Sequence, residues 1–351
     1  MAEYDFSVET IQYNIPSDRK PVEEFLSRLQ LSYDEDVSLT IVVKQGDAIV
    51  ATGSLAGNVL KCIGVSPEYQ GSGLTNTVVS RLEMEAYYRH TEHLFLFSKP
   101  RNEHIFSDLG FSLVGKYPDT VVLLEKPSGM FDQWLTMLEK ERRGEQSVSL
   151  VMNCNPFTLG HRYLVEKASN TAGEKGERVH LFVVSEDRSL FPMDVRFDLV
   201  RRGTADLENV MVHSGGPYII SNATFPTYFI RDPGDAGRIH AGLDLHIFGG
   251  RIAPALGINL RMVGEEPFCP VTRGYNRAMA EILPQYGVEV REIPRLAIGK
   301  AAVSASFVRD LIRNDRLEEV RSLVPVSTWE YLRSDAALPV IEKIRKEDRR
   351  H

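Results

Sequence analysis

Short apolar runs and amphipathic stretches alternate along the first third of the chain. Two apolar runs, at residues 38–44 and 48–56, are separated by a Gln-Gly-Asp sequence that is typical of a hairpin turn. Apolar residues at helical spacing predict a helix over residues 76–90. We place Val78, Val79, Leu82, Ala86 and Tyr87 on its apolar face. We also expect strands over residues 59–65, 94–97 and 121–124, the last closing the sheet, and a short helix over residues 105–109. These elements predict a mixed α/β domain.

From residue 147 onward the pattern changes to strands that alternate with helices. The run over residues 178–185 is continuously apolar, as in a strand that is covered on both faces. Such alternation predicts an open, Rossmann-like parallel sheet, which binds ligands at the carboxyl ends of its strands. We expect strands over residues 147–153, 178–185, 209–214, 243–248, 260–263 and 287–293, and helices over residues 160–171, 195–207, 306–313 and 328–332.

A seam separates the two patterns. The Lys-Pro-Ser-Gly sequence at residues 126–129 breaks regular structure. It is followed by apolar residues at helical spacing and then by the charged run at residues 139–145. We therefore expect three parts: a mixed α/β domain over residues 1–127, a connecting helix over residues 128–146, and a parallel-sheet domain with C-terminal helices over residues 147–351.

Composition limits the classes of function and the compartment. The 351 residues are 43% hydrophobic and 25% charged, and the formal net charge is −7. An acidic chain does not suit a protein that coats nucleic acid or an anionic membrane. The three cysteines form no CxxC pair, no apolar run reaches the ~18–20 residues that cross a bilayer, and the acidic start lacks a secretion signal. We expect a cytoplasmic protein.

The most informative stretch follows the strand at residues 147–153 and opens the next helix. Gly160 allows the backbone to approach a ligand closely, and His161 falls in the first helical turn, where N–H groups and the helix dipole attract anions. The candidate phosphate-binding residues here are Asn155, Pro156, Phe157, Thr158, Gly160 and His161. A helix N-cap at Thr158 beside a partly buried histidine would explain the same pattern without a ligand.

A second group of candidate phosphate ligands lies near the C-terminus. Ser304 and Ser306 open a helix, and Arg309 follows one turn later. Hydroxyls, helix N–H groups and a guanidinium together suit an anion, and Lys300 is a further candidate cation. A capped helix with a surface arginine is the structural alternative.

Together the two groups resemble the paired [H/T]-x-G-H and S-x-S-x-x-R motifs of the HxGH nucleotidyltransferase-like proteins. Thr158 stands where many members of that superfamily have a first histidine. The resemblance implies that both motifs hold the triphosphate of a nucleotide, that the α-phosphorus is attacked, and that diphosphate leaves.

In the first domain, a glycine turn follows the strand at residues 59–65. Gly71 and Gly73 permit a turn whose backbone N–H groups converge on an anion at a helix N-terminus. The stretch resembles the Q/R-x-x-G-x-G/A motif of GCN5-related N-acetyltransferases, although Thr75 replaces its last small residue, and residues 106–111 resemble a second segment of that fold. The resemblance implies that a CoA-like arm binds to Gln70, Gly71, Gly73 and Leu74.

Nearly the whole chain resembles the [citrate (pro-3S)-lyase] ligase family, over residues 151–168, 222–229, 264–272 and 304–312. The resemblance implies that acetate and ATP form acetyl-adenylate, with release of diphosphate. The acetyl group then passes to the thiol of a phosphoribosyl-dephospho-coenzyme A group on the acyl carrier (gamma) subunit of citrate lyase, with release of AMP. Mg²⁺ is expected as a counter-ion held mostly by phosphates and water, with no protein ligands assigned.

The resemblance also assigns roles to single residues. An acetate that attacks the α-phosphorus meets like-charge repulsion, so cations must neutralise the triphosphate. We expect Thr158 and His161 at the α- and β-phosphates, and Ser304, Ser306 and Arg309 at the β- and γ-phosphates.

Two further residues and three alternatives complete the predictions. Glu265 is a candidate contact to ribose or adenine, and Cys154 is expected to fill space rather than to act as a nucleophile.

The chain would alternatively be an adenylyltransferase for a small phosphate monoester, an N-acetyltransferase with a regulatory nucleotide domain, or a nucleotide sensor without catalysis. Only the leading hypothesis requires both ATP and acetate.

Overall fold

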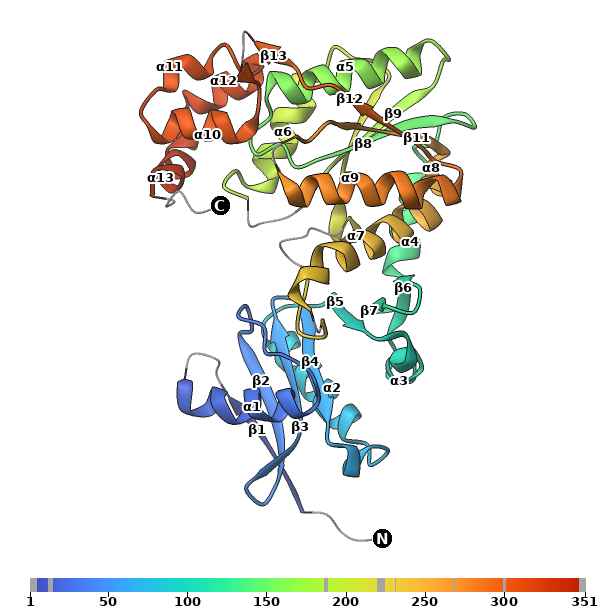
Figure 1. The fold of residues 1–351 in the computed structure, drawn as a ribbon, viewed down its shortest axis with the longest axis vertical. Coiled ribbons are helices and arrows are strands. Elements are labelled where there is room, and N and C mark those ends of the chain that lie inside the picture. The colour runs from blue at the N-terminus through green and yellow to red at the C-terminus, as the bar shows by residue number, and fades with distance from the viewer. Residues whose placement is uncertain are drawn as a thin grey trace. The chain divides into compact units, whose positions relative to one another are not determined.

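The computed structural model describes residues 5–11, 15–185, 189–219, 225–230, 232–267, 269–298 and 301–346. The chain forms two compact units (Figure 1). Unit 1 combines Met1–Trp134 with Phe225–Leu243, and unit 2 combines Leu135–Thr224 with Asp244–His351. Unit 1 therefore contains a segment that lies, by sequence, well inside the second half of the chain.

Unit 1 contains a seven-stranded sheet with the order β1-β2-β3-β4-β5-β7-β6. Its neighbouring strands are antiparallel except for β4 and β5, which are parallel. The strands are β1 (Phe6–Ile11), β2 (Leu39–Gln45), β3 (Ala48–Ala56), β4 (Val59–Val65), β5 (Leu94–Ser98), β6 (Ser112–Tyr117) and β7 (Val121–Lys126). The predicted mixed α/β architecture is confirmed.

The expectation that residues 121–124 close this sheet is wrong, because β7 lies between β5 and β6 and β6 forms the edge. The sequence of β6 mixes Gly115 and Lys116 with apolar residues, which hides the strand pattern.

Among the described residues, three α-helices lie wholly within unit 1, and α2 supplies most of its helical core. The helices are α1 (Pro16–Arg28), α2 (Leu74–Tyr88) and α3 (Glu103–Asp108). Val78 and Leu82 are fully buried against the sheet, as predicted, and a Cβ atom at Gly53 of β3 would lie 2.5 Å from Val78 Cγ1. Glycine at that position lets the helix approach the sheet closely. Tyr87 was predicted on the same face but is exposed, because it faces away from the strands near the helix end.

Strands β4 and β5 pair over a short length and then separate. Their register joins Val59 to Phe95 and Leu60 to Leu96, although β4 continues to Val65 and β5 to Ser98. The parallel ladder therefore ends while both strands continue. The space between the separated ends becomes the pocket of unit 1, described below.

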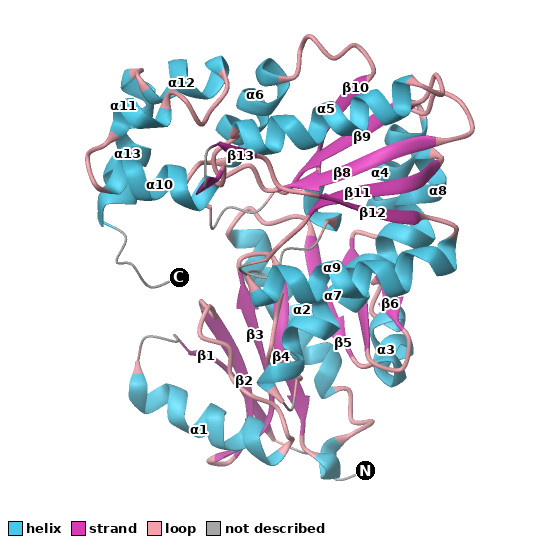
Figure 2. Cartoon of the chain, turned by 45° about the horizontal axis from the view of Figure 1, so that its top comes forward, coloured by secondary structure: helices cyan, strands magenta, loops and turns pink. Residues whose placement is uncertain are grey.

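Unit 2 contains a five-stranded sheet with the order β10-β9-β8-β11-β12, in which all neighbours are parallel (Figure 2). The strands are β8 (Ser147–Met152), β9 (Arg178–Val183), β10 (Val210–Ser214), β11 (Ile258–Gly264) and β12 (Glu289–Ile293). This confirms the predicted Rossmann-like sheet. The strand order reverses between β8 and β11, and in open parallel sheets such a switch point marks the ligand site.

The main core of unit 2 lies on one face of this sheet. Val148, Leu150, Val179 and Leu181 point into it together with residues of α5, α6 and the C-terminal helices. The longer helices of unit 2 are α5 (Leu159–Gly173), α6 (Met193–Gly203), α9 (Pro270–Ile282), α10 (Ala305–Arg313), α12 (Val326–Leu332) and α13 (Leu338–Lys346). The opposite face carries buried polar residues, among them His180 of β9.

The expectation of a strand at residues 243–248 is wrong. This stretch is the end of helix α7 (Ala236–Ile247), which continues as a π-helical turn (Phe248–Ile252) and α8 (Ala253–Leu256). The strand was predicted as one more member of the series in which strands alternate with helices. In the structure Asp244 is buried, and its carboxylate accepts a hydrogen bond from the Tyr275 hydroxyl.

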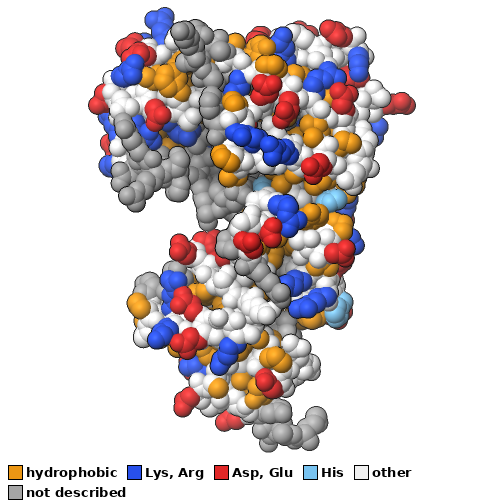
Figure 3. All heavy atoms as spheres, viewed as in Figure 1, with side chains coloured by type: hydrophobic (Ala, Val, Ile, Leu, Met, Phe, Trp, Pro, Cys, Tyr) orange, Lys and Arg blue, Asp and Glu red, His pale blue; other side chains and the backbone are white. Residues whose placement is uncertain are grey.

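The described part of the chain has no membrane-spanning helix, and the face in Figure 3 has no broad basic patch. Among the described residues, no helix combines the length and apolar character that a bilayer crossing requires. Basic and acidic side chains are interspersed over the surface that Figure 3 shows. The cations considered below are therefore local features of single loops and helix starts.

Candidate functional site

A cavity of about 800 Å³ lies at the carboxyl ends of the unit 2 strands. Its walls come from the loops that follow β8, β11 and β12 and from the start of α10. The lining includes Thr158, His161, Glu265, Arg295, Ser304 and Arg309. The two motifs that the sequence places about 150 residues apart thus contribute to one site, which lies at the switch point of the sheet.

A fully buried arginine holds the loop after β8. The Arg196 guanidinium donates to Asn153 O at 2.8 Å, to Asn153 Oδ1 at 2.9 Å and to Val184 O at 2.6 Å. Its Nε donates to Phe191 O at 2.9 Å. Because these acceptors belong to loops after β8 and β9 and to the segment before α6, Arg196 fixes the cavity wall. Sequence analysis did not select this residue.

Thr158 and His161 form a reciprocal cap at the start of α5. Thr158 Oγ1 accepts from the His161 backbone N–H at 3.4 Å, and the Thr158 backbone N–H donates to His161 Nδ1 at 3.1 Å. An N–H group can only donate, so Nδ1 is the unprotonated nitrogen of the neutral ring. The proton of the neutral imidazole therefore resides on Nε2, which leaves that atom as a hydrogen-bond donor.

The same surroundings keep His161 neutral at physiological pH. Burial lowers the pKa of His161 to about 4, and the positive charge of Arg295 contributes to this shift. The ring also stacks on Phe157, with centroids 6.1 Å apart. A rigid, neutral donor of known tautomer suits a phosphate oxygen, whose negative charge it contacts without a proton transfer.

Gly160 brings the two motifs into contact. A Cβ atom at residue 160 would lie 2.5 Å from the carbonyl oxygen of Val303, directly before the second motif. Only glycine permits this approach of the α5 N-terminus to the chain before α10. The predicted importance of Gly160 thus has a structural cause, although the close neighbour is backbone rather than ligand.

The second motif opens α10 with a similar cap. Ser304 Oγ accepts from the Phe307 backbone N–H at 3.2 Å and lies 3.0 Å from Ser306 Oγ. Arg309 Nη1 donates to Asn155 O at 2.5 Å. Arg309 therefore bridges the α10 start and the loop after β8, and its guanidinium faces the cavity that both motifs line.

Three predicted ligands hold the loop rather than line the cavity. The Asn155 side chain accepts from the Phe191 backbone N–H at 3.0 Å, and Pro156 follows it through a cis peptide bond. Phe157 is fully buried in the hydrophobic core. Its ring packs so closely on Gly203 that a Cβ atom built there would lie 2.6 Å from Phe157 Cε1. Lys300, also predicted, lies outside the described residues.

The remaining sequence candidates are placed as follows. Glu265 lines the cavity, and its backbone carbonyl accepts from Arg295 Nε at 2.7 Å. Cys154 is buried, and burial raises the pKa of its thiol far above the ordinary value, which is unfavourable for a nucleophile. This agrees with its expected space-filling role.

Arg295 is the functional candidate that the sequence reasoning missed. It follows β12 directly, lines the cavity and pairs with the Glu266 carboxylate. The available signal was an arginine just past the carboxyl end of a predicted strand, which is the ligand-binding edge of a parallel sheet.

The described residues contain no group of three or more His, Cys, Asp or Glu residues that could hold a metal ion. Among the cavity carboxylates, Glu266 is already paired with Arg295. A divalent cation in this cavity would therefore take most of its ligands from a bound nucleotide and from water.

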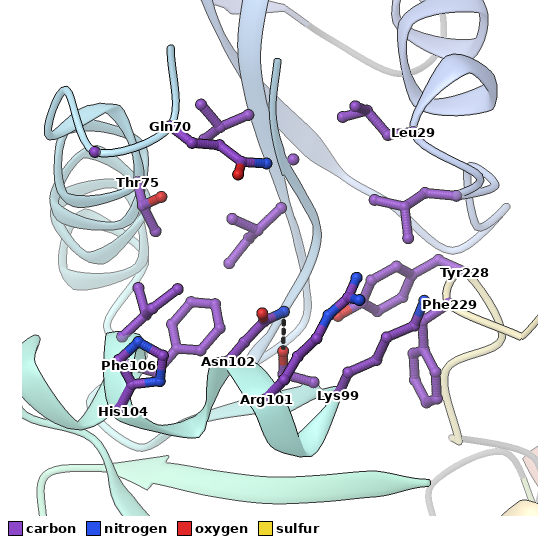
Figure 4. Close-up of a pocket in the computed structure, with 17 residues that line it drawn as sticks. Leu29, Gln70, Thr75, Lys99, Arg101, Asn102, His104, Phe106, Tyr228 and Phe229 are labelled. Carbon is purple, nitrogen blue, oxygen red and sulfur yellow. Dashed lines mark hydrogen bonds between the residues drawn. The ribbon is translucent and has the colours of Figure 1, made fainter. Parts of the chain in front are cut away.

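Unit 1 has a separate pocket of about 630 Å³ between the separated ends of β4 and β5 (Figure 4). Gln70, Gly71 and Thr75 line it on one side. Gly73 has φ +85° and precedes α2 without any side-chain cap. The first N–H groups of α2 are thus not occupied by a capping side chain, unlike those of α5. The side chain of Leu74, also predicted to bind the arm, is buried in the core, so only its backbone N–H is placed to meet a ligand.

Comparisons with known proteins single out one family. Residues 147–332 match the family described as the citrate lyase ligase C-terminal domain. The chain is 40% identical to the [citrate [pro-3S]-lyase] ligase of Klebsiella pneumoniae over 90% of this chain and 92% of that protein. It is 39% identical to the protein of the same name from Escherichia coli K12, over 89% and 90% respectively. The solved structure of Escherichia coli ElaA is similar at 12% identity, with a TM-score of 0.32 over 34% of this chain and 99% of that chain.

Proposed function

The chain belongs to the citrate lyase ligase family, and we propose that this enzyme uses ATP to acetylate a thiol of citrate lyase. Acetate and ATP first give acetyl-adenylate and diphosphate, and the thiol then takes the acetyl group and releases AMP. The observation that carries this proposal is the convergence of His161, Ser304 and Arg309 on one cavity at the switch point of a parallel sheet.

The reaction explains why cations and donors gather there. An acetate oxygen attacks the α-phosphorus while the bond to the β-phosphate oxygen breaks, so negative charge increases on the leaving diphosphate. The Nε2–H of His161 donates to an α- or β-phosphate oxygen, and Thr158 fixes the ring that carries it. Arg309, Ser304 and Ser306 hold the β- and γ-phosphates, and fixed donors of this kind stabilise developing charge without reorganisation.

Two further groups complete the nucleotide site in this proposal. Arg295 adds positive charge on the β12 side, and Glu265 contacts the ribose or the adenine beyond the strand end. Lys300 is assigned to the phosphates from its sequence position alone. Mg²⁺, held by the phosphates and water, would neutralise part of the triphosphate charge.

In the second half-reaction, the thiol sulfur attacks the carbonyl carbon of acetyl-adenylate. A thioester bond forms, the bond between that carbon and the phosphate oxygen breaks, AMP departs, and the thiol proton is released. We assign the unit 1 pocket to the phosphoribosyl-dephospho-coenzyme A arm of the acyl carrier subunit. Gln70, Gly71 and the turn through Gly73 to Leu74 would hold its diphosphate at the uncapped start of α2.

The proposed reaction places the protein in the cytoplasm, where ATP is available. The described cysteines, Cys62, Cys154 and Cys269, are all free thiols, as a reducing compartment favours.

The test is the exchange of labelled diphosphate into ATP, measured with and without acetate, followed by transfer of labelled acetate to the thiol form of citrate lyase. We expect exchange that depends on acetate and transfer that depends on both ATP and the reduced carrier thiol. Exchange that a phosphate monoester stimulates, and acetate does not, would instead identify an adenylyltransferase. Turnover of acetyl-CoA without ATP would identify an N-acetyltransferase.

A further inference from the structure

A segment from far along the chain completes the pocket of unit 1. Residues 225–230 lie between β10 and α7 in sequence, yet Tyr228 and Phe229 line the same pocket as Gln70 and Thr75. The two rings meet edge to face, with centroids 5.1 Å apart, and both are more than nine-tenths buried. They form a continuous aromatic wall at the pocket.

The wall is fixed to strand β5 and to the loop after α1. The Tyr228 hydroxyl donates to Phe97 O at 2.5 Å, and the Ser32 backbone N–H donates to Tyr228 O at 2.8 Å. Phe225 packs edge to face on Phe97, with centroids 5.4 Å apart. The Tyr228 hydroxyl thus takes a β5 carbonyl in the region where β4 has separated from β5.

A buried ion pair holds the segment from behind. Thr227 Oγ1 donates to Asp34 Oδ1 at 3.0 Å, and Asp34 Oδ2 lies 3.2 Å from Lys61 Nζ. Asp34 and Lys61 are both buried, so movement of Thr227 would remove a partner from a desolvated carboxylate. The aromatic wall is therefore a rigid part of unit 1.

The pocket has two chemically different ends. Gln70 and Thr75 lie at one side, where the α2 N-terminus suits phosphate, and Tyr228 and Phe229 lie at the other (Figure 4). An arm whose diphosphate occupies the turn and whose chain follows the pocket would place its sulfur-bearing end near the aromatic wall, where Lys99 and Arg101 also line the pocket. The acyl group on that sulfur then extends toward Tyr228 and Phe229.

We propose that Tyr228 and Phe229 form the acyl end of the arm pocket and restrict the thioester product to a two-carbon acyl group. This inference rests on the proposed function. Because the wall is held by these hydrogen bonds and by the ion pair, it cannot move aside for a longer acyl group. One methylene at an apolar wall changes selectivity by roughly 10–200-fold, so we expect acetyl to be preferred over propionyl by about 10-fold or more.

The test separates thiol acylation from adenylation. Acetate, propionate and butyrate are compared in diphosphate exchange, which reports only the nucleotide site, and in acylation of the citrate lyase thiol. Phe229→Ala enlarges the pocket end, and we expect it to lower the acetyl-over-propionyl ratio of thiol acylation by at least fivefold relative to exchange. Tyr87→Ala is the control, because this exposed aromatic residue of α2 does not line the pocket and its loss should leave the ratio unchanged.

A binding measurement makes the test independent of turnover. The affinities of full-length protein for acetyl-dephospho-CoA and butyryl-dephospho-CoA are measured by calorimetry, together with thermal unfolding of each variant. If Phe229→Ala does not fold, Phe229→Leu provides the smaller enlargement. We expect butyryl-dephospho-CoA to bind the enlarged pocket more tightly than it binds the wild-type protein.

Several outcomes would overturn the proposal. They are equal acylation with all three acids by the wild type, a selectivity change that appears equally in exchange, or unchanged ratios and affinities in a folded Phe229 variant. A wild-type protein without acetate-dependent exchange would instead contradict the proposed function itself, so the two failures are distinguishable.

Discussion

Each of the two cavities described above combines a strand end, a glycine and a helix N-terminus, but they use the helix start differently. At α5, the Thr158 side chain accepts the third N–H of the helix and His161 accepts the N–H of Thr158 itself. At α2, Gly73 precedes the helix with no side-chain cap. The α5 site therefore presents side chains to its ligand, whereas the α2 site presents backbone N–H groups.

The difference teaches how each site responds to mutation. A side-chain site depends on a few atoms whose removal leaves the backbone intact. A backbone site depends on the conformation of the turn, and its vulnerable residues are glycines with positive φ, such as Gly71 at +80° and Gly73 at +85°. Substitutions that separate side-chain chemistry from backbone geometry are the sharpest test of this comparison.

The largest effect is expected at His161. His161→Ala removes the Nε2–H donor, and loss of one preorganised donor to developing charge reduces rates about 10²–10³-fold. Acetate-dependent diphosphate exchange should fall by about that factor. His161→Asn, which retains a side-chain donor, should retain more activity than the alanine variant. Exchange within threefold of wild type in His161→Ala would remove His161 from the catalytic set.

The corresponding substitution in the α2 site is Gly73→Val, which disrupts the turn before the helix. A β-branched residue does not tolerate this positive φ, so the turn must change its conformation. We expect the ratio of thiol acylation to diphosphate exchange to fall by about tenfold. Gly73→Asn is the matched control, because asparagine accepts the left-handed conformation. Equal loss of exchange in the valine variant would contradict the division of labour between the two cavities.

A smaller effect sharpens the electrostatic account of the α5 site. Removing the positive charge in Arg295→Met should raise the pKa of His161 from about 4, although burial, the larger cause, should keep it below 6.5. The measurement is an NMR titration of His161. Arg291→Met, on the same strand and paired with Glu289, is the control. An unchanged His161 titration in Arg295→Met would exclude the proposed charge contact.

The smallest effect concerns acid stability, to which unit 2 contributes its buried imidazoles. Burial lowers the pKa of His180 to about 3 and of His213 to about 4, and these two rings lie 2.9 Å apart from Nδ1 to Nε2. Below about pH 6.5 these two histidines bind protons in the unfolded chain but stay neutral in the folded chain. The free energy of unfolding should therefore fall as the pH falls from about 6.5 to 4.

Replacing one of these rings measures its share of the effect. His180→Gln should reduce the pH dependence of the free energy of unfolding by up to about 1.4 kcal/mol per pH unit, the value for one proton. Chemical denaturation at several pH values provides the measurement. An unchanged slope in a folded variant would show that His180 does not titrate in this range.

Local pattern was sufficient for most elements and for the two phosphate motifs. The period of apolar residues located β4 at residues 59–65 and the buried stripe of α2, and the two caps stand where Thr158 and Ser304 were read as helix starts. Capping and periodicity are properties of a few neighbouring residues, so the sequence alone contains them. The sequence pattern was wrong at residues 243–248, which continue helix α7 instead of forming a strand.

Long-range packing decided everything that joins distant residues. The sequence determined that two motifs existed, but the switch point between β8 and β11 brought His161 to Arg309 and added Arg295. It did not reveal that Arg196 holds the cavity wall, or that Tyr228 and Phe229 join unit 1 through Phe97 and a buried ion pair. Contacts such as those of Arg196 with Asn153 and of Tyr228 with Phe97 join residues far apart in the chain, so no local periodicity encodes them. Their energies arise only in the folded chain, where burial removes each polar group from water and the fold supplies its partners.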